Sequence, residues 1–413
     1  MKKLLVISGR GFPPELDTGV FRTLKIVKYL SRLGYNSIVL APSMSAFKER
    51  DFSLMDDISE GTKVVRSINP LFMLEHHSLQ KLIKSFLIFD SDLGWLPFGY
   101  RRACRILRQE RIDAIYSSSP PVVSHIVASM LKKRTDIPWV ADFRDAWIGH
   151  QEYWALTKHH KRFEEYVEGR VMSTADRLVF ASDPQLEEFK RMHPQISQER
   201  LLFLPTGYDE EDFNSLFQRK SGVLTFSHIG TVNYHYPLDF LRAFRELAAE
   251  IPEFRKLVRI VFCGKIHPKK MRELKALNLG SMLNIRGYLS HKDALQQIAD
   301  SDVLLLFFAD NAGYEKVYTL KIFEYLAARR FVLAIVPPES VAVKVLREVQ
   351  CGIALSPSDI EAIKSEIRGL FEAFLRKGKI DCMPDENAIA RYSSRRSAEI
   401  LVHHLDALTG GRG

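Results

Sequence analysis

The sequence has few cysteines and no long apolar run. Its four cysteines lie far apart, at Cys104, Cys263, Cys351 and Cys382, and no C-x-x-C pair occurs. This spacing indicates neither a disulfide framework nor a zinc site, and it fits a reducing, cytoplasmic setting. The longest apolar runs fall far short of the ~18 residues that would suggest a membrane-spanning helix. The apolar run near the start is also too short for a signal peptide, so we predict a first strand over residues 3–8.

Length and charge set broad limits. A chain of 413 residues exceeds what one hydrophobic core usually supports, which predicts two domains. The composition, 46% hydrophobic and 26% charged, is typical of a soluble globular protein. The net charge of +9 favours anionic partners such as sugar nucleotides or acidic lipid headgroups. No zinc-finger, RRM or helix-turn-helix pattern occurs, so we expect no nucleic acid partner.

Short apolar runs alternate with segments of helical spacing along nearly the whole chain, and the alternation starts again after residue 222. This pattern predicts an α/β fold with two Rossmann-like domains facing across a cleft. The predicted division is a first domain over 1–210, a linker over 211–222 and a second domain over 223–388. Residues 389–413 are predicted to form a helix and tail, and a return of this helix to the first domain is one arrangement open to it.

The loop after the first strand carries glycines and opens a helix. Pro14 stands where a dinucleotide fingerprint would have its third glycine, and the second strand ends in Leu40, Ala41 and Pro42 without an acidic residue. The sequence therefore disfavours a nicotinamide site. Thr18 and Gly19 at the helix start still allow close approach of a phosphate, although an ordinary loop glycine explains the pattern equally well.

Polar residues follow the apolar run at 139–141. Asp142, Arg144 and Asp145 are expected at the carboxyl end of that strand, where open α/β sheets hold their ligands. These three are therefore candidates for a ligand site. A structural ion pair between Arg144 and Asp145 is the alternative.

Residues 318–328 form a predicted helix between two apolar runs, and this segment carries the strongest candidate site. Lys321 and Glu324 share one face near the helix start, whereas Ile322, Phe323, Leu326 and Ala327 are expected to pack on the sheet. A helix start after a parallel strand favours anionic ligands. Gly264, Lys265, Arg286, Gly287 and Tyr288 follow other strands of the same predicted sheet. This set suits a nucleoside diphosphate held without a metal, and an exposed Lys–Glu pair on an ordinary helix is the alternative.

Residues 71–111 are rich in aromatic and basic side chains. Such a segment can lie on an anionic membrane surface. We favour the other interpretation, one or two helices that face the core and expose a basic side.

The order of these motifs resembles the family-4-type (group 1) glycosyltransferases of the GT-B fold, in particular the bacterial subgroup that builds surface polysaccharides. The resemblance covers nearly the whole chain. It is carried by residues 12–15 with Thr18 and Gly19, and by residues 119–121, 139–145, 206–209, 286–288 with His291, and 321–326.

This resemblance implies retaining, metal-independent transfer of a sugar from a nucleotide-sugar donor, with a UDP-sugar favoured, to a lipid-linked, polysaccharide or other glycan acceptor. No cofactor besides the donor is implied, and the expected location is the cytoplasm, with peripheral binding to the inner face of the cell membrane as an option. The implied donor-binding residues are Gly19, Gly230, Thr231, Gly264, Lys265, Arg286, Gly287, Tyr288, Thr319, Leu320, Lys321 and Glu324. Thr18 and Arg22 are the implied acceptor-binding residues, and Asp142, Arg144 and Asp145 are the candidates for the catalytic region. The resemblance also implies that the domain over 1–210 holds the acceptor and the domain over 223–388 binds the nucleotide sugar.

Two positions depart from the family pattern. Lys316 replaces a glutamate eight residues before Glu324. The Arg and Lys that many relatives carry shortly after the matching glycine are absent after Gly230. Lys321 is then the first choice for neutralising the phosphates. These departures leave two alternatives open: a non-catalytic partner protein of the same fold, or a sugar-nucleotide epimerase or hydrolase.

Overall fold

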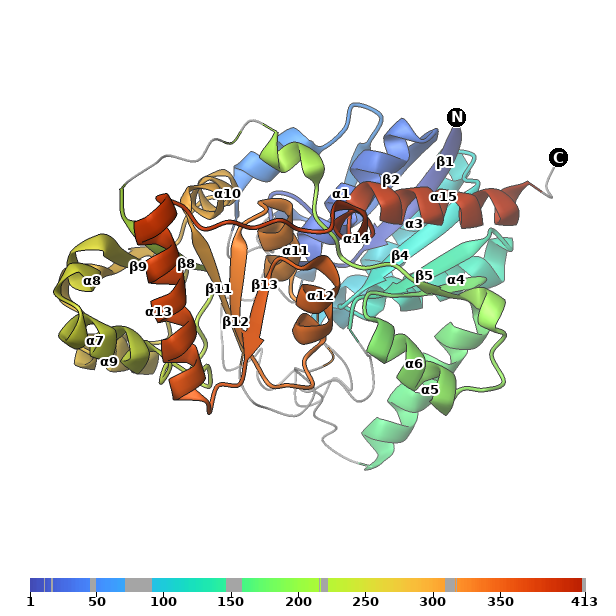
Figure 1. Ribbon diagram of the computed structural model, residues 1–413. Helices are drawn as coiled ribbons and strands as arrows, with labels where there is room; N and C mark the ends of the chain where they lie inside the picture. The colour runs from blue at the N-terminus through green and yellow to red at the C-terminus, as the bar shows by residue number, and fades with distance from the viewer. Residues whose placement is uncertain are drawn as a thin grey trace. The chain divides into compact units, whose positions relative to one another are not determined.

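The computed structural model describes residues 1–10, 12–15, 18–44, 50–70, 91–145, 158–214, 216, 222–308, 316 and 318–410. The chain forms two compact units, Met1–Thr206 together with Ser394–Gly413, and Gly207–Ser393 (Figure 1). The chain therefore passes from one unit to the other twice, at 206/207 and at 393/394. Much of the predicted linker over 211–222 lies outside the described residues.

The first unit contains a seven-stranded parallel sheet in the order β3-β2-β1-β4-β5-β6-β7. Its strands are β1 (Lys2–Ser8), β2 (Tyr35–Pro42), β3 (Lys63–Ser67), β4 (Ala114–Ser119), β5 (Trp139–Phe143), β6 (Arg177–Phe180) and β7 (Leu201–Phe203). Strand β3 is short and mostly polar, which is why the apolar runs of the sequence did not predict it.

Helices cover both faces of this sheet. They are α1 (Thr18–Arg32), α3 (Leu96–Gln109), α4 (Val123–Thr135), α5 (Lys158–Thr174), α6 (Asp183–Met192) and α15 (Ser394–Thr409). Apolar side chains of α1 and α15 pack on one face, and those of α3, α4, α5 and α6 pack on the other. Asp406 of α15 accepts hydrogen bonds from Lys2 Nζ at 2.6 Å and from Tyr35 Oη at 2.8 Å, so the end of the chain is fixed to the first sheet.

The sequence predicted one helix over 389–408, and this prediction is wrong in detail. The structure has two helices there, α14 (Glu386–Ala390) in the second unit and α15 in the first. Ser393 between them pairs with Tyr208 as an isolated bridge, and the Tyr208 amide donates to the Tyr392 carbonyl at 3.0 Å. Tertiary pairing therefore interrupts a segment whose apolar spacing is helical.

The second unit contains a six-stranded parallel sheet in the order β10-β9-β8-β11-β12-β13. Its strands are β8 (Leu224–Ile229), β9 (Val258–Cys263), β10 (Leu283–Gly287), β11 (Val303–Phe307), β12 (Phe331–Ile335) and β13 (Gly352–Leu355). Its helices are α7 (Leu241–Glu250), α8 (Pro252–Leu257), α9 (Pro268–Ala276), α10 (His291–Asp300), α11 (Leu320–Ala327), α12 (Val341–Val349), α13 (Ile360–Lys377) and α14.

Two apolar layers enclose this sheet. Helices α7, α8, α9 and α13 bury their apolar sides on one face, and α10, α11, α12 and α14 bury theirs on the other. The four residues of the 318–328 segment expected to pack on the sheet are all at most 3% exposed. The α/β prediction with two Rossmann-like sheets is confirmed.

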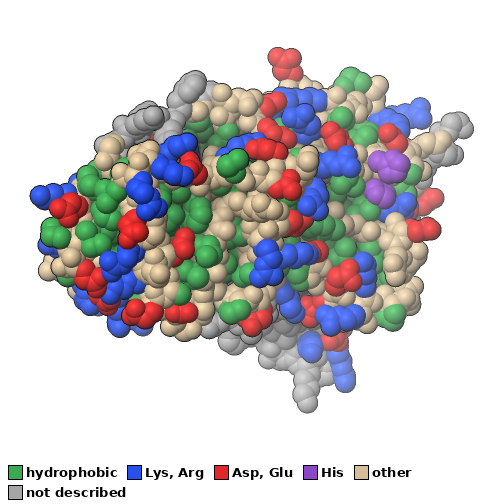
Figure 2. All heavy atoms as spheres, in the orientation of Figure 1, with side chains coloured by type: hydrophobic (Ala, Val, Ile, Leu, Met, Phe, Trp, Pro, Cys, Tyr) green, Lys and Arg blue, Asp and Glu red, His purple; other side chains and the backbone are tan. Residues whose placement is uncertain are grey.

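The aromatic and basic segment at 71–111 is described only from residue 91 onward. There, α3 buries Ala103, Cys104 and Ile106 and exposes Arg101, Arg105 and Arg108. On the face drawn in Figure 2, basic and acidic side chains are interspersed and do not form one large field. In the part of the chain that the structure describes, no helix combines the length and hydrophobicity needed to cross a bilayer.

Candidate functional site

Three glycines stand at the carboxyl ends of three neighbouring strands in the second unit: Gly230 after β8, Gly264 after β9 and Gly287 at the end of β10. Their φ angles are +134°, +127° and +70°, values that side chains disfavour. The Gly230 amide donates to the Cys263 carbonyl at 2.7 Å, and the Gly264 amide donates to the Gly287 carbonyl at 2.6 Å. A Cβ on Gly264 would lie 2.4 Å from the Gly230 carbonyl oxygen. The strand ends therefore form a continuous backbone edge without side chains.

Lys321, in the first turn of α11, lies across this edge. A Cβ on Gly230 would lie 2.2 Å from Lys321 Cε and 2.8 Å from Nζ. The ammonium group is also 5.8 Å from the centre of the Tyr236 ring. Burial lowers the pKa of Lys321 to about 8, and the Glu324 carboxylate partly opposes this shift. The glycine thus makes room for a cation that is poorly solvated and held at a helix N-terminus.

Helix α11 is tied directly to the end of β8. The Tyr325 hydroxyl accepts a hydrogen bond from the Ile229 amide at 3.0 Å, and burial raises the pKa of Tyr325. Thr319 occupies the N-cap position of α11 with extended backbone angles, and its side chain makes no cap hydrogen bond. Leu320 begins the helix. The backbone geometry of these residues points the first amide groups of α11 out of the helix N-terminus.

Glu324, one turn after Lys321, lies near a histidine. The Glu324 side chain is 15% exposed, and its Oε1 atom is 4.0 Å from His291 Nδ1 at the start of α10. His291 Nε2 is 3.6 Å from Asp212 Oδ2. The imidazole therefore lies between two carboxylates of the same unit.

The outer residues of this edge are exposed. Thr231, Lys265, Arg286 and Tyr288 follow or end the same strands, and Tyr288 is 50% exposed. Arg286 donates to Gln297 Oε1 at 2.6 Å, and Gln297 in turn donates to the Ser227 hydroxyl at 3.2 Å. The structure thus brings Gly230, Gly264 and Gly287 together and places Lys321 against Gly230, with the exposed basic residues on adjoining strand ends.

In the first unit, Arg144 lies across Gly19 in a related way. A Cβ on Gly19 would lie 1.1 Å from a terminal nitrogen of Arg144. Arg144 Nε donates to the Ser119 carbonyl at 3.1 Å, and a terminal nitrogen donates to the Pro120 carbonyl. Arg144 is therefore fixed at the carboxyl end of β4 and at the start of α1.

A buried ion pair lies nearby. Arg22 donates twice to Asp142, from Nε at 2.8 Å and from a terminal nitrogen at 2.7 Å, and both side chains are at most 1% exposed. The hydroxyls of Tyr116 and Ser118 also donate to Asp142, at 2.5 and 3.1 Å. Burial by itself would raise the pKa of Asp142, but Arg22 and the Tyr116 hydroxyl bring it below its ordinary value.

This burial bears on the roles expected for the pair. Asp142 was predicted in the catalytic region and Arg22 at the acceptor, and the structure buries both side chains. The geometry gives them a supporting role, in which they hold α1 on β5. Asp145 is partly exposed, and Thr18 begins α1, but the Thr18 side chain lies outside the described part of the chain.

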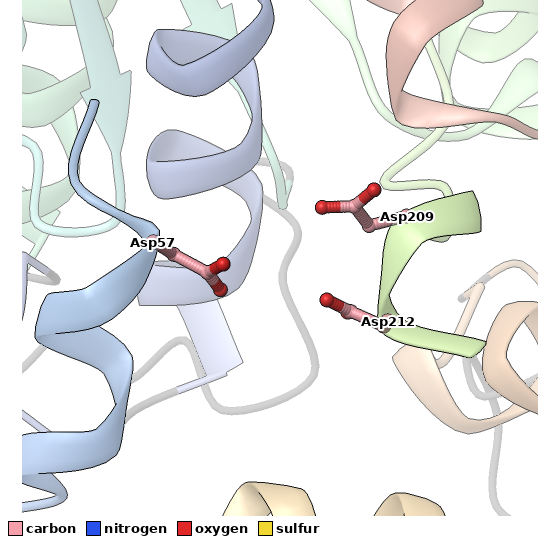
Figure 3. Close-up of side chains that lie close together, drawn as sticks. All are labelled: Asp57, Asp209 and Asp212. Carbon is pink, nitrogen blue, oxygen red and sulfur yellow. The ribbon is translucent and has the colours of Figure 1, made fainter. Parts of the chain in front are cut away.

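Figure 3 labels Asp57, Asp209 and Asp212, of which Asp57 belongs to the first unit and the other two to the second. Asp209 caps the short helix η6 (Glu210–Phe213) of the second unit, accepting from the Glu211 amide at 3.0 Å, and Asp212 lies within that helix. Asp57 ends η2 (Phe52–Asp57) of the first unit and pairs with Lys25 at 2.7 Å. Each has a role within its own unit, and we assign no metal to them.

Sequence reasoning missed several residues of the second unit's site. Tyr236, Tyr325 and Gln297 gave no signal, because apolar spacing marks Tyr325 as a core residue and the other two belong to no motif. His291 was noted only as part of the family pattern. Asp302, just before β11, accepts from the Thr225 amide at 2.9 Å.

Comparisons with known proteins agree with this architecture. Residues 19–207 match the family model of the glycosyl transferase 4-like domain. A search of curated proteins gave no match.

Several solved structures share the fold of the whole chain. HepE from Anabaena, solved in complex with UDP-glucose, has 15% identity and a TM-score of 0.65, over 98% of this chain and 100% of the other. Sucrose-phosphate synthase from Thermosynechococcus elongatus has 14% identity and a TM-score of 0.66, over 100% of both chains. WaaG, a glycosyltransferase involved in lipopolysaccharide biosynthesis, has 14% identity and a TM-score of 0.59, over 98% of this chain and 100% of the other.

The two parallel sheets, the strand-end glycines and the domain match lead to one assignment. Residues 19–207 are similar to the glycosyl transferase 4-like domain, and the whole chain shares the two-sheet GT-B fold of these glycosyltransferase structures.

Proposed function

We propose that the second unit binds the diphosphate of a nucleotide-sugar donor, a UDP-sugar in the first instance. The observation that carries this proposal is the contact of Lys321 with Gly230 at the N-terminus of α11. A diphosphate needs positive charge and backbone amides with room for close approach, and this edge offers both. The complex of HepE with UDP-glucose supports the choice of base.

In this proposal Glu324 accepts hydrogen bonds from the ribose hydroxyls. It lies one turn after Lys321, partly exposed, and His291 stands beside its carboxylate. Thr231, Lys265, Arg286 and Tyr288 surround the nucleotide from the adjoining strand ends, and the first amides of α11, at Leu320 and Lys321, face the phosphates.

Replacing Glu324 by alanine is expected to weaken donor binding by about 1.5–3 kcal/mol, the value of a charge-assisted hydrogen bond. Unchanged UDP affinity in that variant would remove Glu324 from the site.

We propose a retaining reaction that needs no metal. The chain supplies Lys321 to offset the charge that develops on the leaving diphosphate, and no protein nucleophile is required if the leaving phosphate takes the acceptor proton. Arg144, fixed across Gly19, is the residue of the first unit with a side chain placed for contact with substrate. The acceptor we propose is a lipid-linked or polysaccharide glycan, a choice supported by the described role of WaaG.

We also propose that the enzyme acts in the cytoplasm, bound to the inner face of a cell membrane that contains anionic lipids. The exposed arginines of α3 recur at positions 101, 105 and 108, and therefore share one helix side. Lys133 and Arg134 are exposed at the end of α4, which packs beside α3. Sedimentation with vesicles rich in phosphatidylglycerol, compared with phosphatidylcholine alone, tests this. A chain with all three arginines changed to glutamate should lose the binding, and equal binding by that variant would contradict the proposal.

The experiment that tests the central proposal is thermal unfolding in the presence of UDP, GDP, CDP, ADP or NAD. A ligand at ~100 times its dissociation constant adds ~2.7 kcal/mol of stability, so one nucleoside diphosphate should stand out. Transfer is then measured with the matching radiolabelled sugar nucleotide and membrane lipid extract, with and without EDTA. Product formed from the donor alone would indicate a hydrolase or epimerase, and no shift with any nucleotide would favour a non-catalytic protein.

A further inference from the structure

Two cysteines that are far apart in the sequence meet in the second unit. Cys351 Sγ and Cys382 Sγ are 2.8 Å apart, although the two residues are 31 positions apart in the sequence. Cys351 lies in the turn between α12 and β13, and Cys382 lies in the connection between α13 and α14. The other two cysteines, Cys104 in α3 and Cys263 in β9, belong to other elements.

The two thiols differ in access. Cys351 is completely buried, and its Sγ also lies 3.3 Å from the Arg330 carbonyl oxygen. Cys382 is partly exposed, so a small reagent from solution reaches it first. The hydrogen bond from Cys351, together with the charge of Arg330, lowers the pKa of Cys382 although burial opposes the shift. The hydrogen bond to Cys382 and burial raise the pKa of Cys351. The outer sulfur is thus the nucleophile, and the inner one donates the hydrogen bond.

The backbone holds both cysteines in place. The Val332 amide donates to the Cys351 carbonyl at 3.0 Å, and the Asp385 amide donates to the Val349 carbonyl at 2.9 Å. Arg329 makes two hydrogen bonds of 2.6 Å to Glu386, at the start of α14. Since these contacts fix the segments on both sides, the sulfurs can combine with little movement of the chain.

We propose that Cys351 and Cys382 form a site of reversible oxidation that reacts with small-molecule disulfides and closes to an intrachain disulfide. The Cys382 thiolate attacks one sulfur of the reagent and releases one thiolate, which leaves a mixed disulfide on Cys382. Cys351 then gives its proton to solvent, and its sulfur attacks Cys382 Sγ and displaces the second thiolate. Two electrons pass from the two cysteines to the reagent, which leaves as two thiols.

The cross-link would tie the connection before α14 to the turn before β13. Helix α14 leads to Ser393, where the chain leaves the second unit. This inference does not depend on the nucleotide site, and its test uses no nucleotide.

The test is oxidation of the full chain in mixtures of reduced and oxidised glutathione, followed by alkylation, digestion and mass spectrometry. We expect a peptide pair linked through Cys351 and Cys382 that disappears on reduction. The oxidised protein should unfold at a temperature ~5 °C or more above the reduced protein, because the cross-link restricts the unfolded chain. Cys104→Ser should leave the linked pair unchanged.

Single variants separate the two steps. Cys351→Ser should accumulate glutathione on Cys382, whereas Cys382→Ser should show neither the link nor the adduct. If Cys351→Ser does not fold, Cys382→Ser, which alters a partly exposed side chain, still tests the link. Glutathione retained on Cys382 of the wild-type chain without the linked pair would overturn the proposal. Zinc bound through both thiols in the purified protein would do the same.

Discussion

The two units each place a cationic side chain across a glycine, at the start of helix α1 in the first unit and at the end of strand β8 in the second, but they do so with different chemistry. In the first unit, Arg144 covers Gly19 and is fixed by carbonyl oxygens of residues 119 and 120. In the second, Lys321 covers Gly230, and burial lowers the pKa of Lys321 to about 8. A guanidinium keeps its charge at any pH at which the protein is folded, whereas a desolvated ammonium can lose it near neutrality.

The difference extends to what lies beneath the cation. Under the first unit's site lies the buried Arg22–Asp142 pair, in which Asp142 accepts four hydrogen bonds. Under the second lie backbone amides and the strand-end glycines. The first arrangement depends on two charged side chains, whereas the second depends on glycines that leave the backbone uncovered. Each can therefore be disrupted by a different kind of substitution.

The largest expected effect comes from breaking the buried pair. Asp142→Ala leaves the Arg22 charge buried without its partner, and should lower the free energy of unfolding by about 3–5 kcal/mol. Asp145→Ala, three residues further on and partly exposed, is the matched control, with a change below about 0.5 kcal/mol. Urea unfolding measures both. A change in Asp142→Ala no larger than the control would mean that the pair does not support the fold.

The next effect distinguishes a rigid from a flexible neighbour of glycine. Gly264→Ala places a Cβ 2.4 Å from a backbone oxygen at a φ of +127°, so we expect a loss of about 2–4 kcal/mol in unfolding free energy. In Gly19→Ala, the new Cβ contacts only the end of the Arg144 side chain, which can move. In addition, alanine is favoured over glycine within a helix by about 0.5–1 kcal/mol. Denaturant midpoints of the two variants test this contrast. Equal losses would show that Arg144 is held as firmly as the backbone.

A smaller effect concerns the phosphate site. Lys321→Ala should weaken UDP binding by about 1.5–3 kcal/mol, the contribution of a charged hydrogen bond, and should leave uridine binding unchanged. Lys364→Ala, on α13 and paired with Glu246 and Glu250, is the control lysine and should change neither. Isothermal titration provides both affinities. An equal loss for UDP and uridine would remove Lys321 from the phosphates.

The smallest effect is a pH dependence. Because the folded pKa of Lys321 is about 8, UDP affinity should fall as the pH rises from 7 to 9, by roughly tenfold at most. Folding stability should move the other way: between pH 8 and ~10.4 the unfolded chain binds more protons at this lysine, so its contribution to stability increases with pH. Lys321→Arg should flatten the UDP profile, and a profile that keeps its slope in this variant would assign the pH dependence to another group.

The sequence by itself determined the two α/β halves and the helix that carries Lys321 and Glu324. Apolar runs over 303–307 and 331–335 can satisfy their hydrogen bonds only in a buried sheet, and the helical spacing of 320–327 allows one packed face. Local pattern is enough for such features, because they depend on residues near one another in the chain.

Tertiary structure alone decided which polar groups meet. Asp142 and Arg22 are 120 positions apart, and only the packing of α1 on β5 turns two expected substrate contacts into a buried pair. The meeting of Cys351 with Cys382, and the break in the helix expected over 389–408, likewise depend on contacts with distant segments. Spacing in the sequence carries no information on such pairs, because burial and charge pairing are set by elements that come together only when the sheets form.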